Sequence, residues 1–170
     1  MKKNQSARTM NDKGFSLVEL IIVIAIMAIL VGVVGTQIIP YLERSRRAKD
    51  LQVFSGWNTA GMSAYSMNAD KLSANDEYSI LITDSSVACT DDSLDGSAEL
   101  VKTFCDLTGL TESGTNMIRS KMVSREGHEV KSVKIDIPAY GLAYAPIVTH
   151  VYTDESGTTA SEVFDTIENK

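Results

Sequence analysis

The chain has 170 residues and a formal net charge of −6, from 16 Lys and Arg against 22 Asp and Glu. This excess of carboxylates disfavours general affinity for nucleic acid, whose phosphate backbone attracts basic surfaces. Beyond the apolar stretch described below, roughly 130 residues remain, which is enough for one domain with a modest core and too few for two.

The first 14 residues are polar and basic. They hold four basic residues and one acidic residue, a net charge of +3, from Lys2, Lys3, Arg8, Lys13 and Asp12. Without them the chain carries −9, since −6 less +3 is −9. Four basic residues also follow the apolar run, namely Arg44, Arg46, Arg47 and Lys49. The count of basic residues on the two sides therefore does not decide the orientation in a membrane.

The next segment, residues 20–42, contains no charged side chain. As a helix with a rise of ~1.5 Å per residue, a run of this length extends for ~30–38 Å and can span a bilayer core. It is longer than the ~7–15 apolar residues of a secretory signal. Glu19 stands at its start, where a carboxylate inside a bilayer costs roughly 2.5–3.5 kcal/mol, and the run offers no Lys or Arg as a partner.

The G-F-S-L-V-E-L sequence of residues 14–20, with the apolar run behind it, resembles the class III leader and amino-terminal helix of type IV prepilins. The resemblance covers residues 1–45. In that family a membrane-embedded aspartyl peptidase cuts after the glycine and methylates the new amino terminus. The resemblance implies cleavage between Gly14 and Phe15, N-methylation of Phe15, and pairing of Glu19 with the amino terminus of a neighbouring subunit. The alternative is an ordinary membrane anchor with an incidental glutamate.

Residues 41–69 are predicted to continue the helix beyond Pro40, near which the helix could kink or loosen. Opposite charges at i,i+4 predict the ion pairs Glu43/Arg47 and Arg46/Asp50. An apolar stripe at helical spacing should face a globular head, through Leu51, Phe54, Trp57 or Asn58, Gly61 and Tyr65. The basic cluster of residues 44–49 is either a collar facing solvent or lipid head groups, or a contact with the acidic head of a neighbouring subunit.

The remaining chain predicts an antiparallel sheet with one or two short helices. Strands are expected at 78–83, 130–137, 142–153 and 158–164, with Pro146 confined to an edge or a bulge. Helices are expected at 98–107, ended by Gly109, and at 111–122, with a loop at 85–96 and a frayed tail from 165. The predicted fold class is α+β, a long amino-terminal helix packed on a small antiparallel sheet, as in pilins. The predicted divisions are a leader at 1–14, a transmembrane and assembly helix at 15–42, and an extracellular head at 43–170.

Cys89 and Cys105 are the two cysteines of the chain. An even pair outside the cell favours a disulfide. Such a bridge would stabilise the head by ~3 kcal/mol on the chain-entropy estimate. Cys105 neighbours the apolar face of the predicted helix 98–107, so a buried free thiol is the alternative.

Other polar residues favour ordinary structural roles. The aspartates of one loop predict a solvated turn rather than a calcium site, because no EF-hand spacing is present: Asp91, Asp92 and Asp95. His128 and His150 lack Cys or carboxylate partners at metal-ligand spacing. Tyr140, Tyr144 and Tyr152 are expected to pack in the sheet. No nucleophile elbow or phosphate-binding loop is present, so neither an enzyme nor a cofactor nor a metal is expected.

The resemblance to type IV prepilins implies a structural subunit of a bacterial type IV pilus-like filament. Its expected partners are copies of itself, prepilin peptidase, the pilus assembly machinery and, before assembly, membrane lipid. The resemblance also implies a place in the cytoplasmic membrane with the head outside, and then in an extracellular fibre, with outputs such as adhesion belonging to the fibre. The alternatives are a type II secretion pseudopilin and a membrane-anchored extracellular binding protein that never polymerises.

Overall fold

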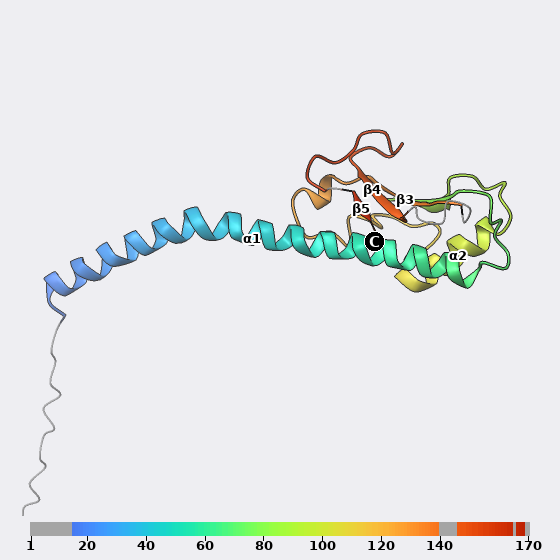
Figure 1. Ribbon diagram of the computed structural model, residues 1–170. Helices are drawn as coiled ribbons and strands as arrows, with labels where there is room; N and C mark the ends of the chain where they lie inside the picture. The colour runs from blue at the N-terminus through green and yellow to red at the C-terminus, as the bar shows by residue number, and fades with distance from the viewer. Residues whose placement is uncertain (1–14, 140–145, 165, 169–170) are drawn as a thin grey trace, which may run out of the picture. The chain divides into compact units, whose positions relative to one another are not determined.

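The computed structural model describes residues 15–139, 146–164 and 166–168. The chain divides into two compact units, Met1–Tyr41 and Leu42–Lys170. The elements, labelled in Figure 1, are α1 Leu17–Met67, β1 Tyr78–Thr83, β2 Val87–Cys89, α2 Ser97–Thr108, the short 3-10 helix η1 Gly127–Glu129, β3 Ser132–Ile137, β4 Val148–Tyr152 and β5 Ile167–Glu168.

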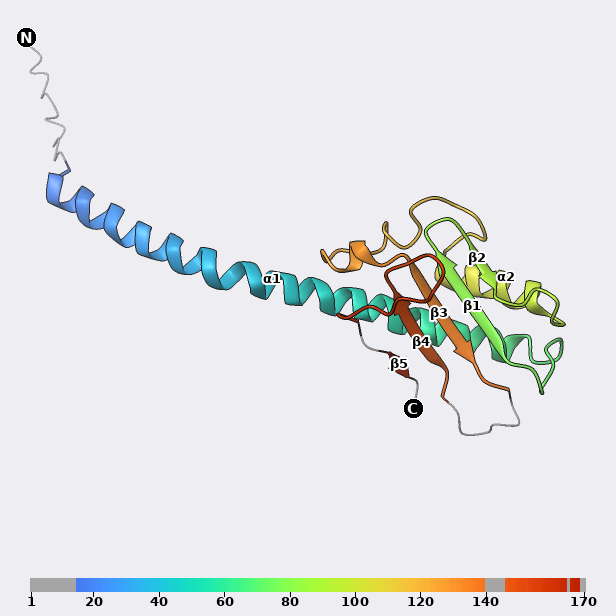
Figure 2. The ribbon, with the colours of Figure 1, turned by 90° about the horizontal axis from the view of Figure 1, so that it is seen from above.

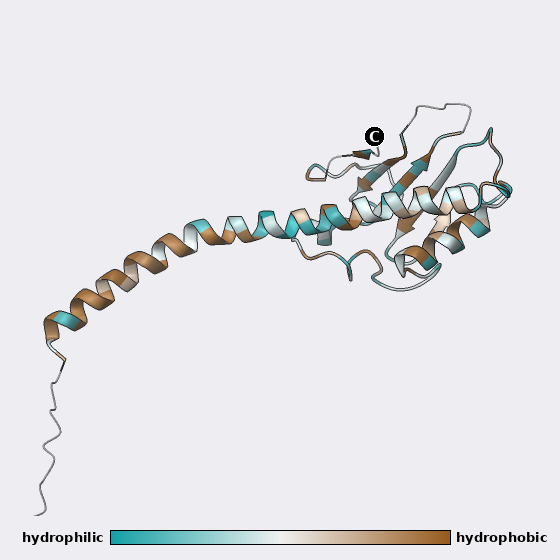
Figure 3. Cartoon of the chain, turned by 60° about the horizontal axis from the view of Figure 1, so that its bottom comes forward, coloured by the Kyte–Doolittle hydropathy of each residue, from teal (hydrophilic) through white to brown (hydrophobic). Residues whose placement is uncertain are grey.

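In the first unit, residues 17–41 form the beginning of α1, and their side chains are exposed. Figure 3 shows that this part of the helix is almost uniformly hydrophobic. The Thr36 hydroxyl donates back to the carbonyl oxygens of Gly32 and Val33, each at 3.2 Å. This local bond satisfies a polar group within an apolar helix. Pro40 lies inside α1, which continues beyond it to Met67.

In the second unit, five strands form one antiparallel sheet in the order β2-β1-β3-β4-β5 (Figure 2). Side chains alternate in burial along β1, where Tyr78, Ile80 and Ile82 are buried. That face packs against α1: a Cβ atom added to Gly61 of α1 would lie 3.1 Å from Ile135 Cγ2 of β3. The predicted α+β class, a long helix packed on a small antiparallel sheet, is confirmed.

The predicted stripe of α1 forms one wall of this core. Phe54, Trp57 and Asn58 are buried, together with Gly61, whereas Leu51 is 38% exposed and lies outside the stripe. The Phe54 ring packs edge-on against Trp57, with centroids 5.8 Å apart, and against Phe164, with centroids 5.2 Å apart. Such pairs add about 0.5–1.5 kcal/mol beyond area burial.

Asn58 joins the helix to the last two strands. Its amide nitrogen donates to Thr149 Oγ1 at 2.9 Å, to the Ile147 carbonyl at 3.2 Å and to the Ile167 carbonyl at 3.3 Å. The predicted strand at 158–164 is wrong, because this segment makes only an isolated bridge between Ala160 and Tyr152. The last strand is instead β5, in the tail that was expected to fray.

Of the other predicted elements of the head, one helix is confirmed and one is wrong. The helix predicted at 98–107 is confirmed as α2, and Gly109 ends it with a left-handed φ of 68°. The short edge strand β2 lies inside the predicted loop 85–96. The helix predicted at 111–122 is wrong: there the carboxylate of Asp84 accepts the backbone N–H groups of Ile118 and Arg119, at 3.1 and 3.0 Å, and holds a turn.

Candidate processing and assembly site

The start of α1 is organised around Glu19. Its Oε2 accepts the backbone N–H of Ser16 at 2.9 Å, while the Leu20 N–H donates to the Ser16 carbonyl at 3.1 Å. This is half of the reciprocal capping box that S-x-x-E sequences form at helix starts. The sequence argument that Glu19 lacks a partner is thus incomplete, because a backbone amide of its own helix supplies one. The S-x-x-E spacing of residues 16–19 is the signal that could have shown it.

Phe15 precedes the helix and is 83% exposed. Gly14 lies outside the described residues, so the scissile bond predicted between the two has no described geometry. From Leu17 to Ile39 the large apolar side chains of α1 are exposed. By length and composition α1 can cross a membrane, the one such helix among the described residues. Exposed apolar surface of this extent marks a site for lipid or for other protein chains.

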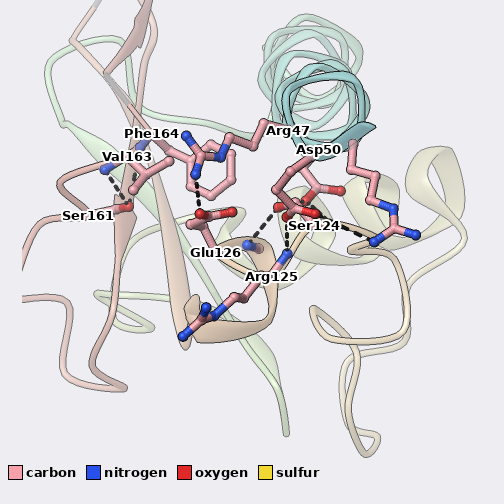
Figure 4. Close-up of polar contacts among 11 residues, drawn as sticks. Arg47, Asp50, Ser124, Arg125, Glu126, Ser161, Val163 and Phe164 are labelled. Carbon is pink, nitrogen blue, oxygen red and sulfur yellow. Dashed lines mark hydrogen bonds and ion pairs between the residues drawn. The ribbon is translucent and has the colours of Figure 1, made fainter. Parts of the chain in front are cut away.

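A second constellation ties the next part of α1 to the head, and Figure 4 shows it. Asp50 of α1 is fully buried, and its carboxylate accepts the backbone N–H groups of Val123 and Ser124 at 2.8 and 2.9 Å, and also the Ser124 hydroxyl. The Ser124 hydroxyl oxygen in turn accepts the Gly127 N–H at 2.8 Å. These hydrogen bonds replace the water that a buried carboxylate loses. We call Asp50, Ser124 and Gly127 the carboxylate clasp.

Charged residues surround the clasp. Glu43 accepts the Arg125 backbone N–H at 2.6 Å and faces Arg46 at 3.5 Å, while Arg47 forms an ion pair with Glu126. That pair raises the pKa of Arg47 and lowers the pKa of Glu126, chiefly through the hydrogen bond between them. The predicted i,i+4 pairs Glu43/Arg47 and Arg46/Asp50 are therefore wrong, because the loop of residues 123–127 offers both carboxylates and Arg47 stronger partners.

The two cysteines lie on neighbouring elements. Cys89 is on β2 and Cys105 on α2, and both are buried free thiols in this structure. Burial raises the pKa of Cys105 to about 11, aided by the negative charges of Glu112 and Asp106. A thiol with so high a pKa is a poor nucleophile at neutral pH. Formation of the predicted disulfide requires an oxidant or exchange with another disulfide in any case, and the small thiolate fraction of Cys105 would slow attack by this thiol.

The disulfide between Cys89 and Cys105 stays a prediction. Non-reducing peptide mapping of exported protein should recover the two cysteines in one linked peptide pair. Reduction should lower the free energy of unfolding of the head by about 3 kcal/mol. Cys89→Ser and Cys105→Ser should each remove this sensitivity to reductant. Alkylation of both thiols in native exported protein would contradict the prediction.

The structure also places the other polar candidates. His150 of β4 lies across from β3, with its Nε2 3.6 Å from Asp136 Oδ2, and Lys134 Nζ is 2.9 Å from Asp136 Oδ1. Sequence spacing did not reveal this pairing. His128 is exposed in η1. Tyr152 is half-buried on β4, whereas Tyr140 and Tyr144 lie outside the described residues.

The three loop aspartates do not converge. Asp91 accepts the Ser93 N–H at 3.0 Å and the Ser93 hydroxyl at 2.5 Å, which lowers the pKa of Asp91. Asp95 contributes its backbone carbonyl as acceptor for the Tyr78 hydroxyl at 2.8 Å. Among the residues that the structure describes, no three His, Cys, Asp or Glu side chains are grouped to hold a metal ion.

Comparison with known proteins identifies the amino-terminal segment. The prokaryotic N-terminal methylation motif matches residues 9–35 of the chain. No curated protein and no solved structure matches the chain. The motif covers Phe15 and Glu19 and continues into the exposed apolar part of α1. The motif and the long apolar helix together fit a prepilin-like protein with a class III leader.

Proposed function

We propose that the chain is processed between Gly14 and Phe15 and then polymerises through α1 into a type IV pilus-like filament. The proposal is supported by the start of α1, where Glu19 accepts a hydrogen bond from the Ser16 N–H. The apolar side chains of α1 that follow are exposed, because nothing in their own unit covers them. Lipid would cover this surface before assembly, with the head outside the cytoplasmic membrane. Helices of other copies would cover it in the extracellular fibre.

The hydrogen bonding of Glu19 is compatible with a transfer of α1 from lipid to a bundle of helices from other copies. Oε2 is engaged by the Ser16 N–H, while Oε1 has no hydrogen-bond partner among the described residues. The free oxygen can accept a charged amino group without releasing the helix cap. After cleavage, the N-methylated amine of Phe15 on a neighbouring copy would be such a group. In a low-dielectric helix bundle the pair would remove two charges that are costly when left alone.

The first test is processing. In wild-type cells, mass spectrometry of surface-sheared protein should find Phe15 as an N-methylated first residue. Gly14→Val should leave the leader attached, because a branched side chain would occupy the space next to the scissile bond. The matched control is Gly35→Ala, since a Cβ atom there meets nothing within 4 Å. An intact leader on wild-type surface protein would refute cleavage at this bond.

The alternatives differ in where the head is found. Imaging of cells with an antibody to the head should show long filaments that contain this chain. Short stubs that follow a secretion apparatus would favour the pseudopilin alternative. A diffuse membrane signal would favour an anchored binding protein and would contradict polymerisation.

A further inference from the structure

The base of the head, where α1 follows the candidate membrane span, presents cations without ionic partners. Its acidic groups are all engaged internally: Glu43 by the Arg125 N–H and Arg46, Asp50 by the loop of residues 123–127, and Glu126 by Arg47. No ion pair forms at Arg44, Lys49 or Arg125 among the described residues. All three are exposed, and Figure 4 shows the Arg125 side chain pointing away from α1.

The charge of the head is divided sharply between this base and the rest. Residues 43–50 and 119–127 hold seven Lys or Arg against three Asp or Glu, a balance of +4. Residues 51–118 and 128–170 hold five Lys or Arg against 17 Asp or Glu, a balance of −12. We call the exposed cations Arg44, Lys49 and Arg125 the basal cations.

This division matters when copies associate. Chains that each carry −9 without the leader repel one another, and the repulsion grows as they are brought close together. A surface that places cations against the acidic part of a neighbour converts part of this repulsion into attraction and fixes the orientation of the contact. The basal cations are exposed and form no ion pair among the described residues, as is also true of Arg119 and Lys121 nearby in the sequence of the base, so they are available for such a contact.

We propose that the basal cations bind the acidic surface of a second copy of this chain, and so set how successive heads stack. This proposal rests on the proposed function for its setting in a filament, but the contact itself can be detected separately. Rim charges of this kind contribute mainly to the rate and specificity of association. Their effect should therefore weaken with added salt, over a Debye length of about 8 Å at physiological ionic strength.

Cross-linking with a water-soluble carbodiimide tests the contact. The reagent joins an ammonium to a nearby carboxylate as an amide, with loss of water that the carbodiimide takes up as a urea. Cells carrying the full-length chain are shifted from light- to heavy-nitrogen medium, and membranes and sheared filaments are then treated. We expect peptides that link Lys49 of one isotope population to an Asp or Glu of the other, fewer of them at high salt. Lys49→Arg is the matched control, because it keeps the charge and removes the reactive amine.

Charge reversal tests the consequence. Arg44→Glu combined with Lys49→Glu should reduce filament yield at least tenfold while processing and the amount in membranes stay normal. Lys71→Glu combined with Lys102→Glu makes the same change of net charge on exposed residues of the acidic part and should have a much smaller effect. Equal losses from the two pairs would overturn the proposal, since net charge alone would then explain both.

The outcomes distinguish a contact between copies from binding of lipid head groups and from the proposed filament role. Loss of the charge-reversed chain from membranes, with Lys49 cross-links between copies absent in the wild type, would assign the basal cations to lipid head groups and overturn the proposal. Normal filaments without any such cross-link would overturn it while leaving the proposed function intact. Cross-links between copies in membranes of cells that form no filament would support the contact and refute the filament role.

Discussion

Glu19→Ala should abolish filament formation while leaving the chain inserted in the membrane. An intramembrane carboxylate costs roughly 2.5–3.5 kcal/mol, so its removal does not hinder insertion of a single copy. In the filament, the Phe15 amine of a neighbouring copy would lose its counter-charge, and a buried charge without a partner costs several kcal/mol. Even ~3 kcal/mol is a factor of more than 100 at each subunit addition. The measurement compares the mutant in membranes and in sheared filaments, in cells lacking the wild-type chain.

Glu19→Gln separates the charge of this residue from its role as a helix cap. The amide oxygen can still accept the Ser16 N–H that Glu19 Oε2 accepts at 2.9 Å, so the start of α1 should be preserved. Charge neutralisation of a neighbour is lost in both variants. If Gln restored the filament yield that Ala removes, the defect would lie in helix capping. A normal yield from Glu19→Ala would refute the polymerisation mechanism altogether.

Gly127→Ala should strongly destabilise the head. A Cβ atom at this position would lie 2.2 Å from Asp50 Oδ2 and 3.0 Å from Met122 Cβ. The carboxylate cannot retreat without breaking hydrogen bonds, because Asp50 is fully buried and its oxygens accept from Val123 and Ser124. Overpacking by one methyl typically costs about 1–3 kcal/mol, and each unsatisfied buried group adds about 1–3 kcal/mol. We therefore expect a loss of about 3 kcal/mol or more in the free energy of unfolding.

The chain offers a matched control in Gly56. A Cβ atom there meets nothing within 4 Å, and the residue lies inside α1. Gly56→Ala should stabilise the helix by about 0.5–1 kcal/mol through its higher helix propensity. Urea unfolding of the detergent-solubilised chains, followed by Trp57 fluorescence, measures both changes. Similar midpoints for the two variants would show that the carboxylate clasp does not hold the head to α1.

Strong local signals account for the elements that were predicted correctly. The uncharged run of residues 20–42 predicts a helix that can span a bilayer, because helix rise and bilayer thickness are fixed lengths. The alternation in β1 and the helical spacing in α2, with Gly109 at its end, depend on neighbouring residues alone. The match to the methylation motif is likewise a property of contiguous sequence, residues 9–35.

Contacts between distant parts of the chain account for what the sequence left open. The short strands β2 and β5 carry too few residues to show a pattern, and each exists because a longer neighbour offers backbone partners. The spacing in segment 111–122 predicts a helix, but the Asp84 carboxylate accepts the backbone N–H groups of Ile118 and Arg119, and the segment forms a turn. By helical spacing, Asn58 was only an alternative to Trp57 in the apolar stripe. In the structure Asn58 is buried and donates hydrogen bonds to Thr149 of β4 and Ile167 of β5.

The sequence by itself determined the methylation motif and the apolar helix, which fit a prepilin-like protein, because both are local and contiguous. The tertiary structure decided which charges of the head remain free. Asp50 and Ser124 are 74 residues apart in the chain, and Arg47 and Glu126 are 79 apart. Spacing along a helix pairs Arg46 with Asp50, but Asp50 is fully buried, and a buried carboxylate needs hydrogen-bond donors that the fold brings to it, since water no longer reaches it. The fold pairs Glu43 and Asp50 with the loop of residues 123–127, and it pairs Glu126 of this loop with Arg47. The basal cations remain exposed.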